Sequence, residues 1–364
     1  MGGIALLAAL LALSGVLVLG CSSDDDAPRA EAPAAGTDTP QAPRAHAGAA
    51  CDRYAAPTGS RRGPGSRAHP YGSLARLLRA LRRGEVGCLM AGHYRHRGVV
   101  TMRRARTTLR PLGRARAVVD GALWVLPGAR GARITGLRLT SHDRVYSIPL
   151  KIQADGVSLV GNDITAARNI SCVLVGSDRT VSDVRIERNR IHACGQSGKL
   201  SHLLYVTSSR DAVIRNNLLI GNRGGWAVHL YPDADGTVIE GNVMDSNKGG
   251  VIFAGDGGGN TSDGNLVREN VITNSAPRFN IESSWSGGPE GSGNRAERNC
   301  VYSGGEGMPS GIGFSDGFET SGNVVARGRV YVNRREGDYR LRSGSNCGPV
   351  LTDVGGAMLR VGPS

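Results

Sequence analysis

Asparagine recurs seven times between residues 162 and 323 in the local pattern apolar-x-x-Asn-x-apolar, or close to it. Successive copies are 27, 28, 25, 28, 29 and 24 residues apart. The seven positions are Asn162, Asn189, Asn217, Asn242, Asn270, Asn299 and Asn323. Such a spacing, with a short apolar segment each time, is typical of stacked repeats, because one repeat alone cannot bury its apolar face. The chain is therefore expected to fold as a stack of similar units.

Each repeat carries short apolar segments that predict strands, because they are rich in β-branched residues and bounded by Gly, Asn, Asp and Ser. The first set covers residues 159–164, 186–191, 214–219, 239–244, 267–272, 296–301 and 320–325. The second set covers residues 171–175, 203–206, 228–231, 251–253, 279–282 and 311–314. Residues 134–139 predict a first rung in which Leu137 replaces the asparagine. No amphipathic segment of helical length lies between residues 134 and 325, which argues against helical repeats.

Two or three strands per repeat, stacked in parallel at about 4.8 Å, predict an all-β fold, a parallel β-helix of about eight to nine coils. Each asparagine is expected where the chain bends between strands, since Asn tolerates a left-handed backbone and caps its own turn. Stacked copies can hydrogen-bond along the axis and satisfy polar groups inside the coil. We therefore interpret the asparagines as structural.

Three segments near the start of the repeats resemble the lead-in of secreted right-handed parallel β-helix proteins of the pectate-lyase-like superfamily. They are residues 51–59 (CDRYAAPTG), 69–74 (HPYGSL) and 84–94 (GEVGCLMAGHY). The resemblance extends over residues 51–350 and implies a right-handed coil. It leaves the activity open, because the superfamily contains lyases, epimerases, hydrolases and non-catalytic members.

The N-terminus resembles a bacterial lipoprotein signal. An apolar run over residues 4–20 ends in Leu19-Gly20-Cys21 and is followed by Ser and Asp residues. The resemblance implies acylation of Cys21 and anchoring on the outer side of the cytoplasmic membrane. No Lys or Arg precedes the run, which departs from the pattern. A plain transmembrane anchor is the alternative, although about 17 residues is at the short edge for spanning a bilayer.

These features divide the chain into five regions. They are a signal peptide (1–20), a disordered tether (21–50), a basic N-terminal cap with the first strands (51–116), the β-helix (117–350) and a C-terminal tail (351–364). Within the cap, residues 73–83 predict a short amphipathic helix with Ser73 as N-cap and Gly84 as its stop. We expect it to plug the open end of the coil, and a position on the membrane surface is the alternative. Residues 338–347 resemble the closing coil of related proteins.

Six cysteines remain once Cys21 is acylated, and an even number in an exported chain predicts disulfides. Fifteen pairings are possible. We favour the pairs that join nearby rungs or fasten an end, namely Cys51 with Cys88, Cys172 with Cys194, and Cys300 with Cys347. No Cys-x-x-Cys or His/Cys cluster occurs, so no metal site is expected.

The formal charge of +13 is concentrated in the cap, where sixteen Arg face only Asp52 and Glu85 between residues 51 and 116. Arg far outnumbers Lys, which is typical of a GC-rich genome. The functional interpretation is that the long-range electrostatic field of the cap attracts an anionic polymer of the cell envelope. Nucleic acid is excluded as a partner, because the chain has few aromatics, no binding motif and an export signal.

The second set of strands changes character from coil to coil. We align residues 202–205, 228–231 and 250–253, so that Leu204, Leu230 and Ile252 share the inward face with Ile281. The period of two then places Tyr205, His229 and Tyr231 outward as candidate catalytic residues. Residues expected to bind substrate around them are Lys199, His202, Asp233, Phe253, Asp256, Asn280 and Glu282. The surrounding segment 226–236 (WAVHLYPDADG) resembles a characteristic stretch of related exported bacterial β-helix proteins.

A Tyr-His-Tyr face suits β-elimination or C5 epimerisation of a uronate-containing polysaccharide, which needs a base at C5 and a group that neutralises the carboxylate. Because free tyrosine has a pKa near 10, a cationic neighbour must lower it for Tyr205 or Tyr231 to act as base. Saccharide binding without turnover and a purely structural surface are the alternatives. No cofactor is expected, although the Gly-rich loop around Asp256 suits calcium.

A glycoside hydrolase that uses Asp233 and Glu282 is a further candidate, which depends on their separation. The motifs Asn-Thr-Asp and Gly-His-Gly, typical of polygalacturonase-type hydrolases, are absent.

Overall fold

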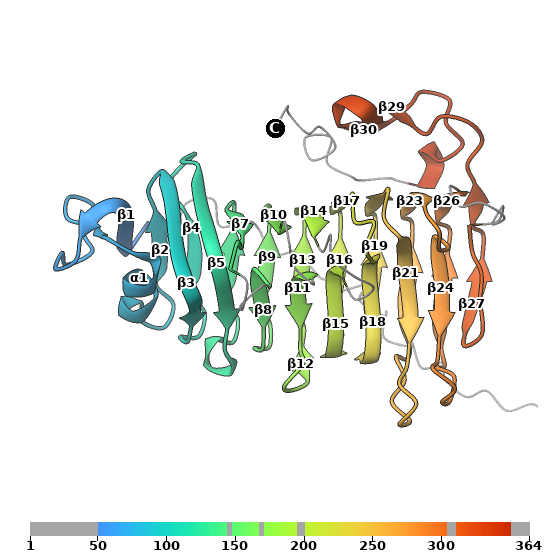
Figure 1. Ribbon diagram of the computed structural model, residues 1–364, viewed down its shortest axis with the longest axis horizontal. Helices are drawn as coiled ribbons and strands as arrows, with labels where there is room; N and C mark the ends of the chain where they lie inside the picture. Colours follow the sequence, from blue (N-terminus) through green and yellow to red (C-terminus); the bar gives the residue numbers. More distant parts are fainter. Residues whose placement is uncertain (1–49, 144–147, 167–170, 195–200, 304–310, 351–364) are drawn as a thin grey trace, which may run out of the picture. The chain divides into compact units, whose positions relative to one another are not determined.

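The chain winds into coils that stack along one axis, as Figure 1 shows. The computed structural model describes residues 50–143, 148–166, 171–194, 201–303 and 311–350. In these ranges every strand pair is parallel except one near the C-terminus. The fold is a right-handed parallel β-helix of about nine coils, so the predicted fold class is confirmed.

Three parallel sheets run along the coils, and the chain passes through sheets 1, 2 and 3 in turn. Sheet 1 contains β1 (Arg53–Ser60), β2 (Val86–Leu89), β4 (Thr108–Pro111), β6 (Arg133–Thr135), β9 (Ser158–Val160), β13 (Arg185–Glu187), β16 (Val213–Arg215), β19 (Val238–Glu240), β22 (Leu266–Arg268), β25 (Asn294–Glu297) and β27 (Phe318–Ser321). Sheet 2 contains β7 (Arg138–Thr140), β10 (Asp163–Ala166), β14 (Arg190–Cys194), β17 (Leu218–Ile220), β20 (Val243–Asp245), β23 (Val271–Ser275), β26 (Cys300–Ser303) and β28 (Val324–Val325). Sheet 3 contains β8 (Leu150–Ile152), β11 (Ser171–Val175), β15 (His202–Arg210), β18 (Trp226–Asp235), β21 (Gly249–Ala254) and β24 (Ile281–Ser284).

Two long strands start the stack, because β5 (Ala117–Val125) pairs with β3 (Gly92–Met102) on one side and with both β7 and β8 on the other. The two-residue strand β12 (Val181–Ser182) pairs with the end of β15. Sheets 2 and 3 are therefore continuous in the first coils and separate later.

Each segment predicted as one strand at an asparagine is in fact two strands, with the asparagine at the bend between sheets 1 and 2. Asn189 shows the pattern. Its Nδ2 donates to the Leu159 carbonyl at 2.9 Å and to Asn217 Oδ1 at 3.1 Å, and its backbone N–H donates to the same oxygen at 2.8 Å. The same bonds connect the copies from Asn162 to Asn323. The structural interpretation of this ladder is confirmed, and the Leu137 N–H donates to Asn162 at its first rung.

The proposed reason for the asparagine at the bend was wrong. The residue in the left-handed region is the one before each ladder asparagine, including Gly161, Arg188, Glu269 and Arg298, with φ of 66°, 51°, 54° and 48°. The side chain of the asparagine instead replaces the hydrogen bonds that the sharp bend removes from the sheets. Asparagine is therefore required for its amide group rather than for its backbone freedom.

Apolar side chains fill the coil in columns. In sheet 1 the column runs through Ile134, Leu159, Ile186, Ile214 and Ile239, all at most 1% exposed and in register along the axis. Because the strand period is two, each column places the intervening side chains on the outer surface. The interior therefore leaves all chemistry to the outward-facing positions and the turns.

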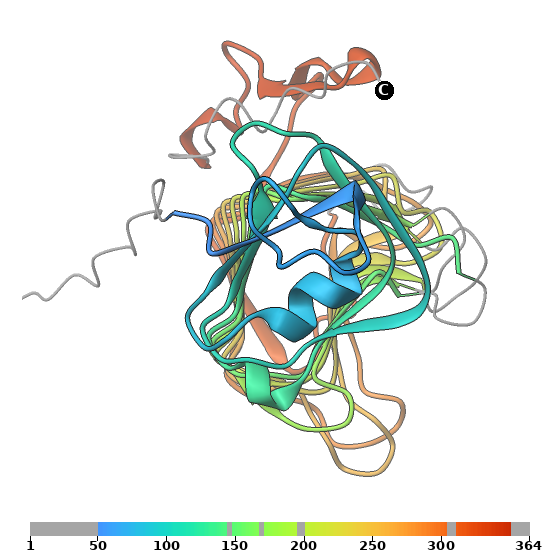
Figure 2. The ribbon, with the colours of Figure 1, turned by 90° about the vertical axis from the view of Figure 1, so that its left-hand side faces the viewer.

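The predicted capping helix is present as α1 (Leu74–Ala80), and Figure 2 shows it across the opening of the first coils. Ser73 Oγ accepts a hydrogen bond from the Arg76 N–H, as expected of an N-cap. The helix ends before the predicted stop, because Leu81 has an extended backbone. Leu74, Leu77 and Leu81 are at most 2% exposed, so the helix closes the apolar end of the stack.

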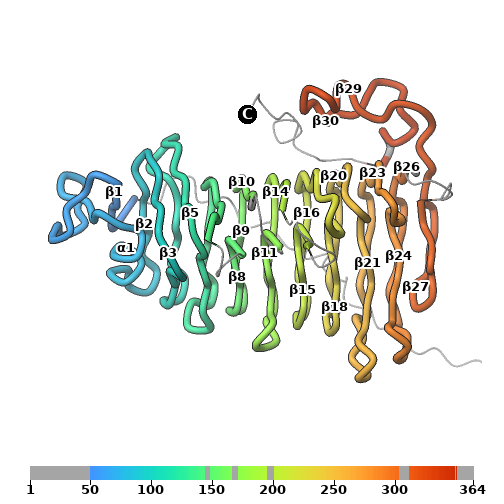
Figure 3. Tube along the Cα trace, in the orientation of Figure 1, coloured from blue at the N-terminus to red at the C-terminus, as the bar shows by residue number. Residues whose placement is uncertain are grey.

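The C-terminal segment does not form the closing coil that its sequence resembles. It leaves the last coil and folds back over the outer face of sheet 2 as an antiparallel hairpin, β29 (Tyr331–Asn333) and β30 (Asp338–Leu341), which Figure 3 shows in red. We call residues 326–350 the C-terminal arm. Apolar arm residues including Val330, Tyr331 and Tyr339 pack on sheet 2 in a second buried cluster, separate from the coil interior.

Three disulfides have the pairing favoured from the sequence. Cys51–Cys88 fastens the cap, Cys172–Cys194 connects sheets 3 and 2, and Cys300–Cys347 fastens the C-terminal arm. Short 3-10 turns occur at Pro127–Ala129, Arg334–Glu336 and Gly348–Val350. Across the described ranges, no helix has the length and apolar character needed to cross a bilayer. The predicted signal peptide, Cys21, the predicted tether up to residue 49 and the predicted C-terminal tail (351–364) lie outside the described residues.

We expect Asn217→Ala to lower the free energy of unfolding by about 2–5 kcal/mol, because the Asn189 N–H and the Ile186 carbonyl would remain buried without a partner. Urea denaturation monitored by circular dichroism measures the change. Asn323→Ala is the matched control at the half-buried last rung, where water can replace the amide, and we expect a loss below about 1.5 kcal/mol. Equal losses at both positions would contradict a burial-dependent role.

Candidate functional site

The candidate site lies on the outer face of sheet 3. Leu204 pairs with Val228, and Tyr205 pairs with His229. The alignment made from the sequence placed Tyr205 opposite Tyr231 and was therefore two residues out of register. One outward row instead runs along the axis through Leu174, Tyr205, His229, Ile252 and Glu282.

The structure corrects three predicted positions. Phe253 was expected outward as a substrate contact, but it is fully buried in the coil and packs on Phe318 with ring centroids 5.0 Å apart. Ile252 was expected inward and lies in the outward row. Asn280 was expected outward and is 1% exposed, with its Nδ2 donating to the Tyr302 carbonyl. The sequence alignment allowed one residue of slack in the following turn, but the turn lengths differ from coil to coil and the strand pattern alone did not determine this register.

The three predicted catalytic residues do come together. The Tyr205 and His229 rings are stacked at 5.1 Å with an interplanar angle of 16°, and the Tyr231 ring lies 5.4 Å from His229 and 6.4 Å from Tyr205. All three side chains are partly exposed. His202 adds a fourth ring, 4.4 Å from His229 and 5.1 Å from Tyr205. We call these four residues the Tyr-His cluster.

Burial keeps both imidazoles neutral. It lowers the pKa of His229 to about 3, and it lowers the pKa of fully buried His202 well below its ordinary value, with a further contribution from the neighbouring His229 and Lys248. His229 Nδ1 and His202 Nε2 are 2.9 Å apart and share one hydrogen bond. His202 Nδ1 is buried and has no hydrogen-bond partner among the described residues. The pair therefore holds one shared proton position and one unsatisfied nitrogen.

The tyrosine chemistry differs from the hypothesis made from the sequence. Burial, with the nearby Tyr231, raises the pKa of Tyr205 to about 12. The expectation that a cation lowers this pKa is therefore wrong for Tyr205, which keeps its proton at neutral pH. A protonated phenol can donate a proton or a hydrogen bond, while a neutral imidazole can accept a proton.

A cationic corner adjoins the Tyr-His cluster, where the chain turns from sheet 2 into sheet 3. The Trp226 ring lies 5.5 Å from His229, with Lys248 Nζ 4.7 Å and the Arg278 guanidinium 5.8 Å from its centroid. Glu282 lies beneath them, fully buried, and accepts from Trp226 Nε1 and from Arg278. Burial raises the pKa of Glu282, and the hydrogen bonds from Arg278 and Trp226 oppose that effect.

Sequence reasoning missed Trp226, Lys248 and Arg278 as site residues. Their signal was present, because each lies just before or at the start of a strand of sheet 3, in the same turn of successive coils. The predicted residue Lys199 lies outside the described residues.

Two predicted acidic residues contact other groups. Asp233 lies near the far end of β18 and forms an ion pair with Arg210 at 2.8 Å. Asp256 lies in an exposed loop after β21, where it accepts hydrogen bonds from the Gly258 N–H, the Asn260 N–H and Asn260 Nδ2. No contact in the described structure brings either carboxylate to the Tyr-His cluster.

The molecule is thus a right-handed parallel β-helix protein with a polar aromatic face on sheet 3. Residues 130–327 match the family described as Periplasmic copper-binding protein (NosD), and the chain belongs to this family. Membership in a periplasmic family and the three disulfides support an exported protein. No curated protein sequence matches the chain significantly.

Several solved structures are similar in fold. Pectate lyase Pel9A is 12% identical with a TM-score of 0.49, over 82% of this chain and 91% of that protein. The Dettilon tailspike protein (gp208) is 13% identical with a TM-score of 0.45, over 66% of this chain and 59% of the tailspike. PfbA, a surface adhesin of Streptococcus pneumoniae, is 10% identical with a TM-score of 0.44, over 69% and 79%. Similarities of this size carry no information about the substrate of this chain.

The described residues do not fit the copper ion that the family description names. All six described cysteines are in disulfides and offer no thiolate. His202 Nε2 and His229 Nδ1 lie 2.9 Å apart and are hydrogen-bonded to each other. No group of three or more His, Cys, Asp or Glu in the described ranges is placed to hold a metal.

The buried imidazoles predict a pH-dependent stability. The folded state keeps His229 neutral down to about pH 3, while the unfolded chain takes up its proton near pH 6.5. The unfolded state therefore binds more protons in this window, and stability is full above pH 6.5 and falls toward pH 3. In His229→Gln, the slope of the free energy of unfolding against pH in this window should be smaller than in wild type by about 1.4 kcal/mol per pH unit, which corresponds to one proton.

Urea unfolding at pH 7, 6, 5 and 4 measures the dependence. His69→Gln serves as the control because His69 is exposed in the cap. Parallel pH profiles for wild type and His229→Gln would contradict the neutral, buried state of His229.

Proposed function

We propose that this protein binds an acidic, uronate-containing polysaccharide on sheet 3 and acts on it as a lyase or C5-epimerase. The observation that carries the proposal is the Tyr205–His229–Tyr231 arrangement, in which a neutral imidazole lies beside two phenols at the outer surface. Lyases and epimerases share one first step, removal of the C5 proton next to the carboxylate.

His229 is the proposed base, in place of a tyrosinate. When Nδ1 carries the proton shared with His202, the lone pair is on Nε2, which forms no hydrogen bond within the described residues. An anionic substrate beside the ring would favour its charged form and raise the low pKa of His229 toward the working pH. His202 acts through His229 as a positioning residue, since the shared hydrogen bond fixes the orientation of the ring.

The tyrosines and the cationic corner complete the reaction. Tyr205 and Tyr231 are the proposed proton donors, either to the leaving oxygen in elimination or to the opposite face of C5 in epimerisation. Lys248 and Arg278 would neutralise the sugar carboxylate and stabilise the charge that develops when C5 loses its proton. Trp226 offers the partly exposed ring on which a sugar can lie.

Polysaccharide binding without turnover is the second candidate, and the low pKa of His229 in the free protein favours it. Hydrolysis by paired carboxylates has less support, because Asp233 is paired with Arg210 while Glu282 is buried beneath Arg278 and Trp226. We expect no role for calcium at Asp256, whose oxygens are already bonded within its own loop.

Deuterium exchange at C5 tests the chemistry that lyase and epimerase share. Purified protein is incubated in D2O with alginate, pectate, glycosaminoglycans and bacterial uronans, with NMR for exchange and absorbance near roughly 235 nm for the unsaturated product of elimination. We expect exchange with one of these polymers and a loss of at least about 100-fold in His229→Ala. Tyr231→Phe should block product formation more than exchange.

Tyr54→Phe in the cap is the matched control and should leave the rate unchanged. If no polymer shows exchange while binding to a glycan array is retained, the protein binds polysaccharide without turnover and the enzyme proposal is rejected. If His229→Ala and Trp226→Ala leave binding unchanged, sheet 3 is neither the active site nor the binding site of the two proposed functions.

We further propose that Cys21 is acylated and tethers the β-helix to the outer side of the cytoplasmic membrane, which is supported by the sequence resemblance of residues 18–21 alone. A fatty-acid analogue should label the full-length protein in the membrane fraction, and Cys21→Ser should abolish the label. Labelling that persists in Cys21→Ser would contradict the anchor.

A further inference from the structure

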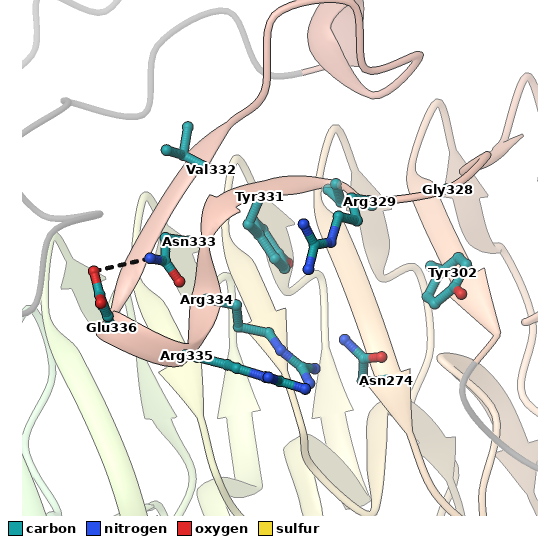
Figure 4. Close-up of a pocket in the computed structure, with 11 residues that line it drawn as sticks. Asn274, Tyr302, Gly328, Arg329, Tyr331, Val332, Asn333, Arg334, Arg335 and Glu336 are labelled. Atoms are coloured by element: carbon teal, nitrogen blue, oxygen red, sulfur yellow. Dashed lines mark hydrogen bonds between the residues drawn. The ribbon is translucent and has the colours of Figure 1, made fainter.

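A second cavity lies between the C-terminal arm and sheet 2, apart from the sheet 3 site. It has a volume of about 690 Å³ and is lined on the coil side by Asn274 and Tyr302. Its other walls come from residues 328–336 of the arm. Figure 4 shows the arm passing over the strands, with Arg329, Arg334 and Arg335 directed into the space between.

The cavity has fixed walls. Tyr331 Oη and Thr273 Oγ1 are hydrogen-bonded at 2.8 Å, and Arg334 Nη1 lies 3.2 Å from the buried carboxylate of Asp245 on sheet 2. The Asn346 side chain accepts from the Arg327 N–H and donates to the Val325 carbonyl, and the Cys300–Cys347 disulfide fastens the arm. Since polar, apolar and covalent contacts all position the arm, the cavity is a preformed feature of the fold.

Three guanidinium groups enter this cavity. Figure 4 shows Arg334 and Arg335 extending toward Asn274, and Arg329 pointing into the same space. Arg334 is neutralised by Asp245, whereas Arg329 and Arg335 form no ion pair within the described residues. The one carboxylate of the lining, Glu336, accepts a hydrogen bond from Asn333 at 2.8 Å. The space near Asn274 therefore holds an excess of positive charge with unused donors.

We propose that this cavity binds the carboxylate of an acidic sugar residue, as a second glycan site on sheet 2. Arg329 and Arg335 present planar forks that match a carboxylate. Asn274 Nδ2 donates to Asp245 Oδ1 at 2.6 Å, and its Oδ1 can accept from a sugar hydroxyl. The half-buried Tyr302 ring offers an apolar wall for the sugar ring. The site holds a glycan without any chemistry and needs no turnover on sheet 3.

Calorimetric titration of the full-length protein with trigalacturonate at low salt tests the proposal. His229→Ala is the background in every arm, so that no turnover occurs. Arg329→Gln with Arg335→Gln should weaken binding about 100-fold, which is about tenfold for each charge-assisted contact. Arg327→Gln removes a neighbouring exposed charge of the same arm outside the cavity and should change affinity less than about twofold.

Inorganic sulfate and a neutral galactose trisaccharide distinguish the sources of binding. Competition by sulfate with no binding of the neutral sugar supports recognition of the oxyanion. Arginine-dependent binding of sulfate together with failure of trigalacturonate would overturn the acidic-sugar assignment, and an equal loss in Arg327→Gln would overturn the site. Because C5 exchange is measured separately, inactivity on sheet 3 with intact binding here rejects only the proposed enzyme.

Discussion

The fold depends on how the chain turns a corner without losing backbone hydrogen bonds. Each passage from sheet 1 to sheet 2 removes N–H and C=O groups from both ladders, in an interior that water does not reach. The Asn189 amide replaces the missing bonds by donating to the Leu159 carbonyl of the preceding coil and to Asn217 Oδ1 of the next. The strain of left-handed Arg188, Glu269 and Arg298 is tolerated because the neighbouring asparagines fix the bend on both sides.

The side chains in the inward columns are apolar, so the polarity of the side chains varies from coil to coil on the outer surface. The inward columns accept only apolar side chains, whereas an outward position can change from Leu174 to Tyr205 to His229 with no loss of interior packing. Chemistry therefore accumulates where neighbouring coils bring different residues into register. Burial then shifts the pKa values of these groups, so that Tyr205 stays protonated and His229 stays neutral.

The features that recur in every coil could be predicted from the sequence, whereas the features in which the coils differ could not. Local sequence patterns predicted the repeat period, the asparagine ladder, the capping helix and the disulfide pairing. These patterns either recur from coil to coil or lie at the ends of the stack. The register of sheet 3 did not follow from such patterns, because turn lengths vary between coils, and Phe253 was assigned to the wrong face. The grouping of Tyr205, His229 and Tyr231 survived the error because all three still alternate outward. Arg278 and Glu282 meet across a turn, and the C-terminal arm returns over sheet 2, so neither follows from a strand period.

Covalent fastening at both ends has a consequence for how this protein comes apart. A solenoid is held by contacts between neighbouring coils, so its terminal coils have the fewest partners and open first. Here Cys51–Cys88 closes one end and Cys300–Cys347 the other. The disulfides therefore restrain opening from either end, because each terminal segment stays joined to its neighbouring coil. In an oxidising compartment, resistance to proteases then depends on the unfolding rate, and a reducing compartment would weaken it by removing these bonds.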